Sequence, residues 1–327
     1  MSWTTGTPNT SLLTTYLLKK FIPALEDELQ FMKFATKATI PQGMGVTARW
    51  NLFSSPVVNT TALTEGAVDG NELTEMTTAG TEATIAEYGE FIQTNRLMEF
   101  CQVSGSRSEL VNRMSYGGAR SLDRLIHTGP SGGTGAISTT TDFYTGVAAN
   151  GGSGTAATPT AASAAALIGA SKLLRDNAAT GIRGVSGHPD GHFAAILSPR
   201  FELDMVTEGT TGRMTWAEAV TDVPGRMGQE KWVNGFMGSV YGTACYRTQA
   251  FTQTTITSTS DNNFVLADHG VGCLSIIDAD PQIYINTPSS GDVGNPYRNR
   301  STVAWHSYFA ASLLSSDRVV RVYSLAT

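Results

Sequence analysis

The strongest candidates for metal chemistry in this sequence are His188 and His192, which are four residues apart. Neutral imidazole is a common zinc ligand, and two histidines at this spacing on a helix can share one ion. Here, however, Pro189, Asp190 and Gly191 separate them, which is typical of a turn. We can name no third ligand nearby. The pattern therefore favours a loop with two incidental histidines, and we predict no metal and no cofactor.

A glycine-rich stretch at 129–135 is the second candidate, because such loops can cradle phosphate groups. It lacks the Gly-Lys-Ser/Thr ending of a phosphate loop, and it follows an expected helix where a phosphate loop would follow a strand. The chain also has no G-x-S-x-G nucleophile motif. We therefore predict that the protein is not an enzyme and has no catalytic residues.

The cysteines indicate neither a disulfide framework nor a zinc ribbon. Cys101, Cys245 and Cys273 are odd in number, far apart and without a C-x-x-C pair. This favours synthesis in a reducing cytoplasm. The sequence shows no secretory signal and no apolar run of about 18 residues, so we expect no membrane contact.

Carboxylates are concentrated in residues 41–98, where they are Glu65, Asp69, Glu72, Glu75, Glu82, Glu87 and Glu90. Catalytic carboxylate pairs need a pocket that raises the pKa of one of them, and an exposed segment offers none. We interpret these residues as a match for a basic surface on a neighbouring molecule. They would also keep the segment soluble before assembly. The basic candidates in this chain are Arg113, Arg120, Arg124, Arg298 and Arg300.

Residues 41–98 read as one long β-hairpin. Hydrophobic residues alternate from Met44 through Trp50 to Leu52, turn formers follow at 65–72, and 83–92 returns as a strand. An isolated hairpin is at best marginally stable in water, and its open edges invite aggregation. The simplest cover is another copy of the chain, so we predict that Trp50 and the acidic residues make contacts between subunits.

The elements around this hairpin follow from periodicity. A helix is expected over 12–36, and a second one begins with the capping box Ser106–Glu109 and extends to His127. The apolar stripe of the second helix contains Leu110, Met114, Leu122, Leu125 and Ile126. Its arginine face is equally compatible with a solvated surface. A mixed α/β region follows over 160–280, and the strands 303–314 and 318–325 are expected to form a closing hairpin.

Composition favours a surface that is largely covered by other protein. Only 15% of the 327 residues are charged, against a typical quarter, while 41% are hydrophobic. The net charge of −6 argues against nucleic-acid binding as the main task, since phosphate contacts need clustered lysine and arginine.

The order of these parts resembles the major capsid proteins of tailed bacteriophages, which have the HK97 fold, and most closely the phage N4-type family. The match rests on Ala62–Gly66 before Asp69–Leu73, and on Ala86–Ile92. Further support comes from Ile196–Pro199, Val240–Ala244 and Ser307–Ala311. Together these segments extend over nearly the whole chain.

The resemblance implies an α+β, HK97-like capsid fold. It divides the chain into an N-terminal arm (1–40), an extended β-hairpin loop (41–98), a spine helix with its following loop (99–159), an axial domain (160–280) and C-terminal strands that return to the peripheral domain (281–327). The spine helix, about 104–128, belongs to the peripheral domain.

The function implied is a structural one. Copies would assemble as pentamers and hexamers into an icosahedral shell around the genome, with packaged DNA touching the inner face non-specifically. Decoration, scaffolding and portal proteins are the further partners, and the chain would be a virion component assembled in the bacterial host cytoplasm. The alternatives are an encapsulin-like compartment shell and a threonine-rich tail or adhesin protein.

Two features bear on how such a shell would be held. Covalent cross-linking in relatives needs a lysine on the extended loop, and residues 41–98 contain none. We therefore expect non-covalent contacts or added proteins to hold the shell. Because eleven residues precede the first expected helix, we expect no internal scaffolding segment.

Overall fold

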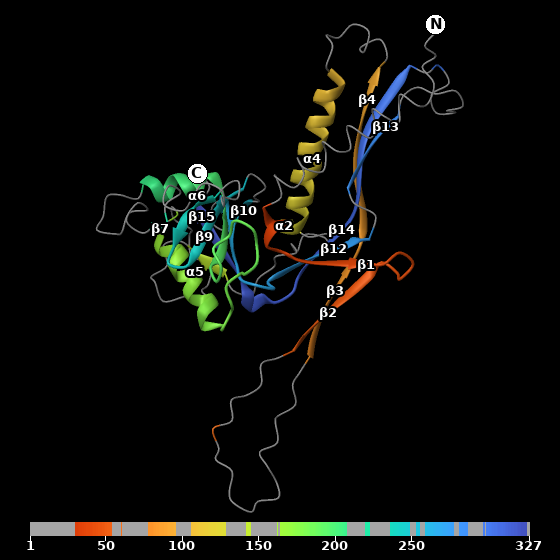
Figure 1. Cartoon of the computed structure of the whole chain (residues 1–327). Helices are drawn as coiled ribbons and strands as arrows, with labels where there is room; N and C mark the ends of the chain where they lie inside the picture. Colours follow the sequence, from red (N-terminus) through yellow and green to blue (C-terminus); the bar gives the residue numbers. More distant parts are fainter. Residues whose placement is uncertain are drawn as a thin grey trace, which may run out of the picture.

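A computed structural model gives the structure of the protein. It describes residues 30–53, 60, 78–95, 106–128, 142–144, 162, 164–207, 220–222, 236–248, 253–255, 259–277, 281–286, 297 and 299–325. Within these residues the chain forms two sheets with helices packed on them, and a two-stranded hairpin that projects from one sheet (Figure 1). The fold is α+β, as the sequence predicted.

The first sheet has five strands, and its centre is the long strand β14 (Arg300–Leu313). One edge of β14 pairs with β4 (Ala86–Asn95) over residues 300–309. The other edge pairs with β13 (Gln282–Asn286) and then with β12 (Val271–Ile276), and β1 (Thr36–Ile40) adds in parallel to β12. β14 can pair with several strands because, with 14 residues, it is longer than each of them.

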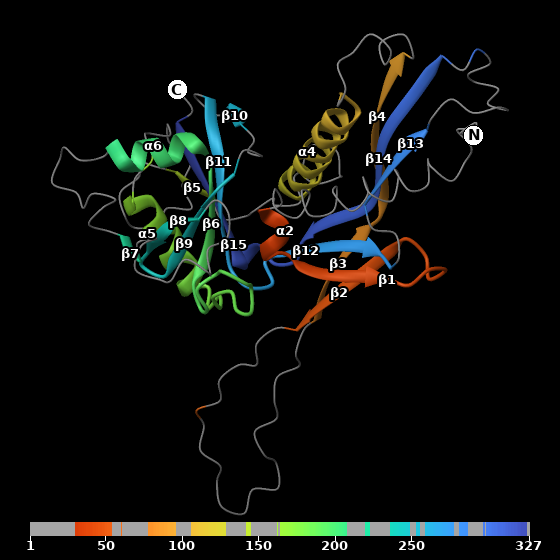
Figure 2. The same ribbon diagram turned by 45° about the horizontal axis from the view of Figure 1, so that its top comes forward.

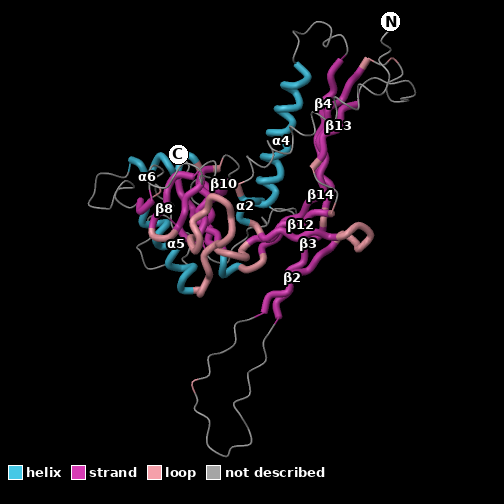
Figure 3. The backbone as a smooth tube through the Cα atoms, viewed as in Figure 1, coloured by secondary structure: helices cyan, strands magenta, loops and turns pink. Residues whose placement is uncertain are grey.

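Helix α4 (Ser106–Thr128) covers one face of this sheet, as Figures 1 and 3 show. The expected stripe is its buried side, with Met114, Leu122 and Ile126 at most 3% exposed. Leu110 and Leu125 are half-buried at its margin. The periodicity of the sequence therefore placed this helix and its inner face correctly.

The second sheet has eight strands. Its main path runs β5 (Asp142–Tyr144), β15 (Val319–Leu325), β11 (Thr259–Leu266), β6 (Phe193–Leu197), β9 (Thr243–Arg247), β8 (Phe236–Val240), β7 (Val220–Asp222), while β10 (Gln253–Thr255) pairs with β11. Every residue of β6 is buried, as expected for a strand covered on both faces.

Helices cover both faces of the eight-stranded sheet (Figure 2). On one side α5 (Ala164–Asp176) and α6 (Pro199–Thr207) bury Leu167 and Phe201 against it. On the other side lie α4 and the short helix α2 (Phe31–Phe34). Ser198, which directly precedes Pro199, caps α6 by accepting a hydrogen bond from the Phe201 N–H at 3.3 Å.

The extended loop forms a hairpin over a shorter length than predicted. β2 (Thr47–Phe53) pairs with β3 (Thr78–Thr84), from Thr47 opposite Thr84 to Phe53 opposite Thr78. The prediction of one continuous two-stranded arm is wrong beyond Ile85, because β4 leaves the hairpin and pairs with β14. The buried Ala83 and Ile85 also give the base of the hairpin a small core.

The predicted closing hairpin is wrong as well. β14 and β15 are joined through the short 3-10 turn η2 (Ser316–Arg318), yet they lie in different sheets.

Three other segments differ from the predicted boundaries. β12 lies within the predicted mixed region 160–280 but pairs in the five-stranded sheet. β5 lies within the stretch that was expected to be a loop. The segment 36–40, expected as part of the arm, is strand β1. Most of the helix expected over 12–36 lies outside the described residues.

Candidate assembly surfaces

The histidine pair is a structural element of the eight-stranded unit. One ring nitrogen of His188 lies 2.8 Å from the Tyr246 hydroxyl, and the other lies 3.0 Å from the carbonyl oxygen of His192. Burial lowers the pKa of His188, which favours the neutral ring. Among the described residues no group of three metal-ligating side chains comes together. The turn interpretation of 188–192 agrees with this geometry.

The two described thiols are unreactive because they are buried. Cys245 and Cys273 are both free and buried. Burial raises the pKa of Cys273 to about 12 and also raises the pKa of Cys245, so both thiols remain protonated at neutral pH. The third cysteine, Cys101, and the glycine-rich stretch 129–135 lie outside the described residues.

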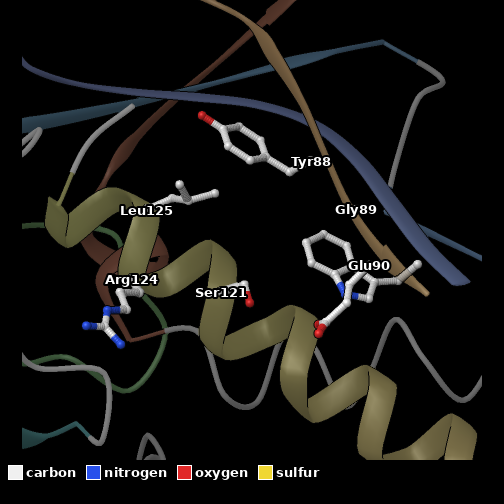
Figure 4. A pocket seen from close by; sticks show the side chains of 7 residues that line it. Tyr88, Gly89, Glu90, Ser121, Arg124 and Leu125 are labelled. Atoms are coloured by element: carbon white, nitrogen blue, oxygen red, sulfur yellow. The ribbon is translucent and has the colours of Figure 1, made fainter. Parts of the chain in front are cut away.

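A pocket of about 370 Å³ lies between α4 and the five-stranded sheet (Figure 4). It is lined by Tyr88, Gly89 and Glu90 of β4, by Ser121, Arg124 and Leu125 of α4, and by Trp305 of β14. Glu90 extends from β4 toward the helix, whereas the Arg124 side chain points away from the strand (Figure 4). The Ser121 hydroxyl donates a hydrogen bond to the Gly117 carbonyl oxygen of its own helix, at 2.8 Å.

The arginines predicted as a contact surface share the outer side of α4. Arg113, Arg120 and Arg124 are all exposed, on the side opposite the buried stripe. Arg300 is exposed at the start of β14, opposite Asn95 of β4. Arg298 lies outside the described residues. The helix therefore presents a basic outer face.

The acidic residues of the loop divide into two groups. Glu82, Glu87 and Glu90 are described and exposed, whereas Glu65, Asp69, Glu72 and Glu75 lie outside the described residues. Glu82 lies 3.9 Å from Arg49 on the neighbouring strand, and both side chains are more than half exposed. Glu87 lies 2.7 Å from the His306 ring across the β4–β14 ladder. Glu82 and Glu87 therefore have partners within their own chain. Exposed pairs of this type contribute little to stability.

Trp50 contacts its own chain. It is half-buried against the cluster formed by Ile40, Leu274 and Ala310, and its ring lies beside Gly272. This packing anchors the base of the hairpin to the five-stranded sheet. A contact of Trp50 with a neighbouring subunit stays a prediction.

Sequence reasoning missed a set of exposed apolar side chains. Phe91 and Tyr284 flank Ala304 in one row across the sheet, on the face opposite α4, and they are 63% and 47% exposed. Met44, Val46 and Phe53 are exposed around the hairpin. The alternation that places Phe91 on the same side as Glu87 was visible in the sequence, but its exposure on the folded subunit was not.

The described helices include none that is long and apolar enough to cross a bilayer. No family model and no curated protein sequence matches the chain.

Solved structures, by contrast, match it along nearly its whole length. The capsid of Ralstonia phage GP4 is 14% identical, with a TM-score of 0.68, covering 93% of this chain and 91% of that one. The head structure of Helicobacter pylori bacteriophage KHP40 is 9% identical, with a TM-score of 0.60, covering 92% and 91%. The capsid of a native GTA particle is 9% identical, with a TM-score of 0.56, covering 91% of each chain. The chain therefore has the HK97-type fold of phage capsid proteins.

Proposed function

We propose that this chain is the major capsid protein of a tailed phage, and that its copies join as pentamers and hexamers into an icosahedral shell around the genome. The observation that carries the proposal is the similarity to the Ralstonia phage GP4 capsid, which extends over more than nine-tenths of both chains. The narrower resemblance to the N4-type family remains a prediction.

The exposed apolar residues support assembly. Exposed apolar side chains can mark contact sites, and here Phe91 and Tyr284 are exposed on the sheet face opposite α4, while Met44 and Phe53 are exposed near the hairpin. Another copy of the chain would bury them. The two patches lie on different parts of the molecule, so a contact between them would be heterologous, which is the kind that builds rings.

Charge provides the second support. We propose that the acidic loop, with Glu65, Asp69, Glu72, Glu75, Glu82 and Glu87, faces the arginine side of α4 or Arg298 and Arg300 in a neighbouring subunit. The exposed Arg113, Arg120 and Arg124 supply a basic surface on a rigid helix. Complementary charges of this kind fix the register of an interface more than they raise its affinity.

In this proposal α4 is the spine helix, the five-stranded sheet with α4 is the peripheral domain, and the eight-stranded sheet with α5 and α6 is the axial domain. The role is mechanical, without catalysis. Scaffolding, decoration and portal proteins and the inner-face DNA are the further partners. The protein would be a virion component assembled in the cytoplasm of a bacterial host.

Electron microscopy of the purified recombinant chain tests the proposal. Closed shells, tubes or rings are expected, and a stable monomer or trimer would instead favour a tail or adhesin protein. Recovery of the chain in DNA-filled particles would distinguish a phage capsid from an encapsulin-like compartment, which shares the fold but encloses other cargo.

A further inference from the structure

One carboxyl group lies where three parts of the molecule meet. Asp123 of α4 is 0% exposed. Its Oδ1 accepts a hydrogen bond from the backbone N–H of Phe31 at 2.9 Å, and its Oδ2 accepts one from the Thr248 hydroxyl at 3.4 Å. Phe31 begins α2, and Thr248 directly follows β9 of the eight-stranded sheet. A single side chain thus links the end of the arm, the long helix and the second sheet.

The segment that Asp123 holds is too short to be stable as an isolated helix. α2 has only four residues, so its conformation depends on tertiary contacts. The Phe31 ring packs edge-on against His127 and Phe264, at centroid distances of 5.4 and 6.0 Å. Phe34 packs against His188 and Tyr246, at 5.3 and 4.8 Å. Releasing this turn would therefore expose two aromatic side chains together with the Asp123 carboxyl.

The charge on Asp123 is costly in this place. Burial raises the pKa of Asp123 to about 7, although hydrogen bonds from Phe31, Thr248 and Gln30 and the charge of Lys33 act in the opposite direction. Lys33 lies on α2, the element that docks. A released, exposed aspartate would return to its ordinary pKa of 3.8.

The other titratable groups at this junction behave differently. Burial lowers the pKa of His127 on α4 to about 4, helped by the charges of Arg124 and Arg321, so its ring is neutral above that pH. The Cys273 thiol of β12 stays protonated, with a pKa near 12. Burial also lowers the pKa of His188, which packs beside Phe34. Docking of residues 30–35 buries this ring in its neutral form, so the contribution of His188 to docking weakens as the pH falls. That effect is opposite in sign to the effect of Asp123.

We propose that Asp123 is a proton-linked latch, which holds residues 30–35 firmly against α4 and the eight-stranded sheet when protonated and loosens them when ionised. This regulation goes beyond the proposed shell function and requires no assembly.

The sign and window of the latch follow from proton linkage. Between about pH 4 and pH 7 the docked carboxyl keeps a proton that the released one has lost, so docking binds a proton. The equilibrium constant for release should therefore rise with pH, by at most about tenfold per unit, and level off above pH 7. Tight docking is expected on the acidic side of this window.

Hydrogen exchange of the full chain, read by mass spectrometry between pH 5 and 8, tests the latch. Protection of the peptide at 30–36 is compared after correction for the pH dependence of intrinsic exchange. Relative to the Asp123→Asn variant, the protection of this peptide in the wild-type chain should fall at least about tenfold from pH 5 to 7 and then change little. Asp123→Asn keeps an oxygen for the Phe31 N–H but cannot lose a proton, so the variant retains only the opposite effect of the histidines.

A matched control is available in Asp204. This carboxyl is also buried at 7% exposure, and it accepts a hydrogen bond from the Ala162 N–H at 3.2 Å, but it is paired with Arg200 at 2.9 Å. Asp204→Asn should keep the wild-type profile of the 30–36 peptide. The decisive quantity is the change of peptide protection with pH in the wild type minus the same change in Asp123→Asn. This difference leaves out the contributions of His127 and His188, which both chains share. A difference of zero would overturn the latch.

A second variant keeps the test valid if Asp123→Asn does not fold. Thr248→Val removes a hydrogen bond that favours the ionised carboxyl, so the pKa of Asp123 should rise further. The loss of protection should then continue above pH 7. An unchanged profile in this folded variant would also contradict the proposal.

Discussion

Leu122 provides a direct test of how the long helix is held. Its side chain is 0% exposed and belongs to the core cluster that also contains Trp305 and Phe309 of β14. The stripe on α4 packs into this cluster, so the helix and the five-stranded sheet share one core. A change at Leu122 should therefore affect the folding of the subunit itself as well as its assembly.

The size of the effect can be worked out from this burial. Leu122→Ala removes three side-chain carbons, worth roughly 2.4 kcal/mol at about 0.8 kcal/mol each. The cavity left in a packed site adds to this, so we expect a loss of about 3–5 kcal/mol. Leu122→Asp adds the cost of burying a carboxyl without a partner, several kcal/mol more. That total approaches the roughly 5–15 kcal/mol by which a typical folded protein is stable.

Urea unfolding of dissociated subunits, followed by circular dichroism, measures both variants. Leu122→Ala should fold with a lower midpoint, and Leu122→Asp should yield no soluble folded subunit. Tyr116→Ala is the matched control, since Tyr116 lies on the same helix but is 51% exposed, and its midpoint should change little. Soluble Leu122→Asp protein that unfolds cooperatively near the wild-type midpoint would refute the placement of this stripe in the core.

Four further predictions concern assembly and backbone packing. Shells should fail to form, while the subunit stays folded, when three loop carboxylates are changed to lysine, namely Glu72, Glu82 and Glu87; normal shells at low salt would contradict the electrostatic contact. In free subunits the amides of β2 and β3 should exchange quickly, whereas β4 is protected by its pairing with β14; equal protection of β2 in free and assembled protein would mean that no neighbour covers it. Gly117→Ala on α4 should raise stability by about 0.5–1 kcal/mol, because a new Cβ has no atom within 4 Å. Gly89→Ala should lower the melting temperature, since its Cβ would lie 2.7 Å from the Trp305 carbonyl oxygen.

The sequence by itself determined the features that depend on neighbouring residues. The apolar stripe predicted α4 and its buried side, because residues three and four apart share a helix face. Ser198 before Pro199 marked the start of α6, and the cap is present. Alternation predicted β2, with Ala48 and Trp50 on its inner side. The resemblance of several short segments in order was enough to predict the fold.

The tertiary structure alone decided which strands pair and which polar groups meet. β14 and β15 are separated by a turn of a few residues, so local reasoning joined them in one hairpin. Their partners β4 and β11 come from elsewhere in the chain, and such pairings leave no local pattern. In the same way, Asp123 and Phe31 are 92 positions apart, and Glu87 and His306 are 219 positions apart. Periodicity indicates which face of an element is buried, but only the packed fold determines what lies against that face.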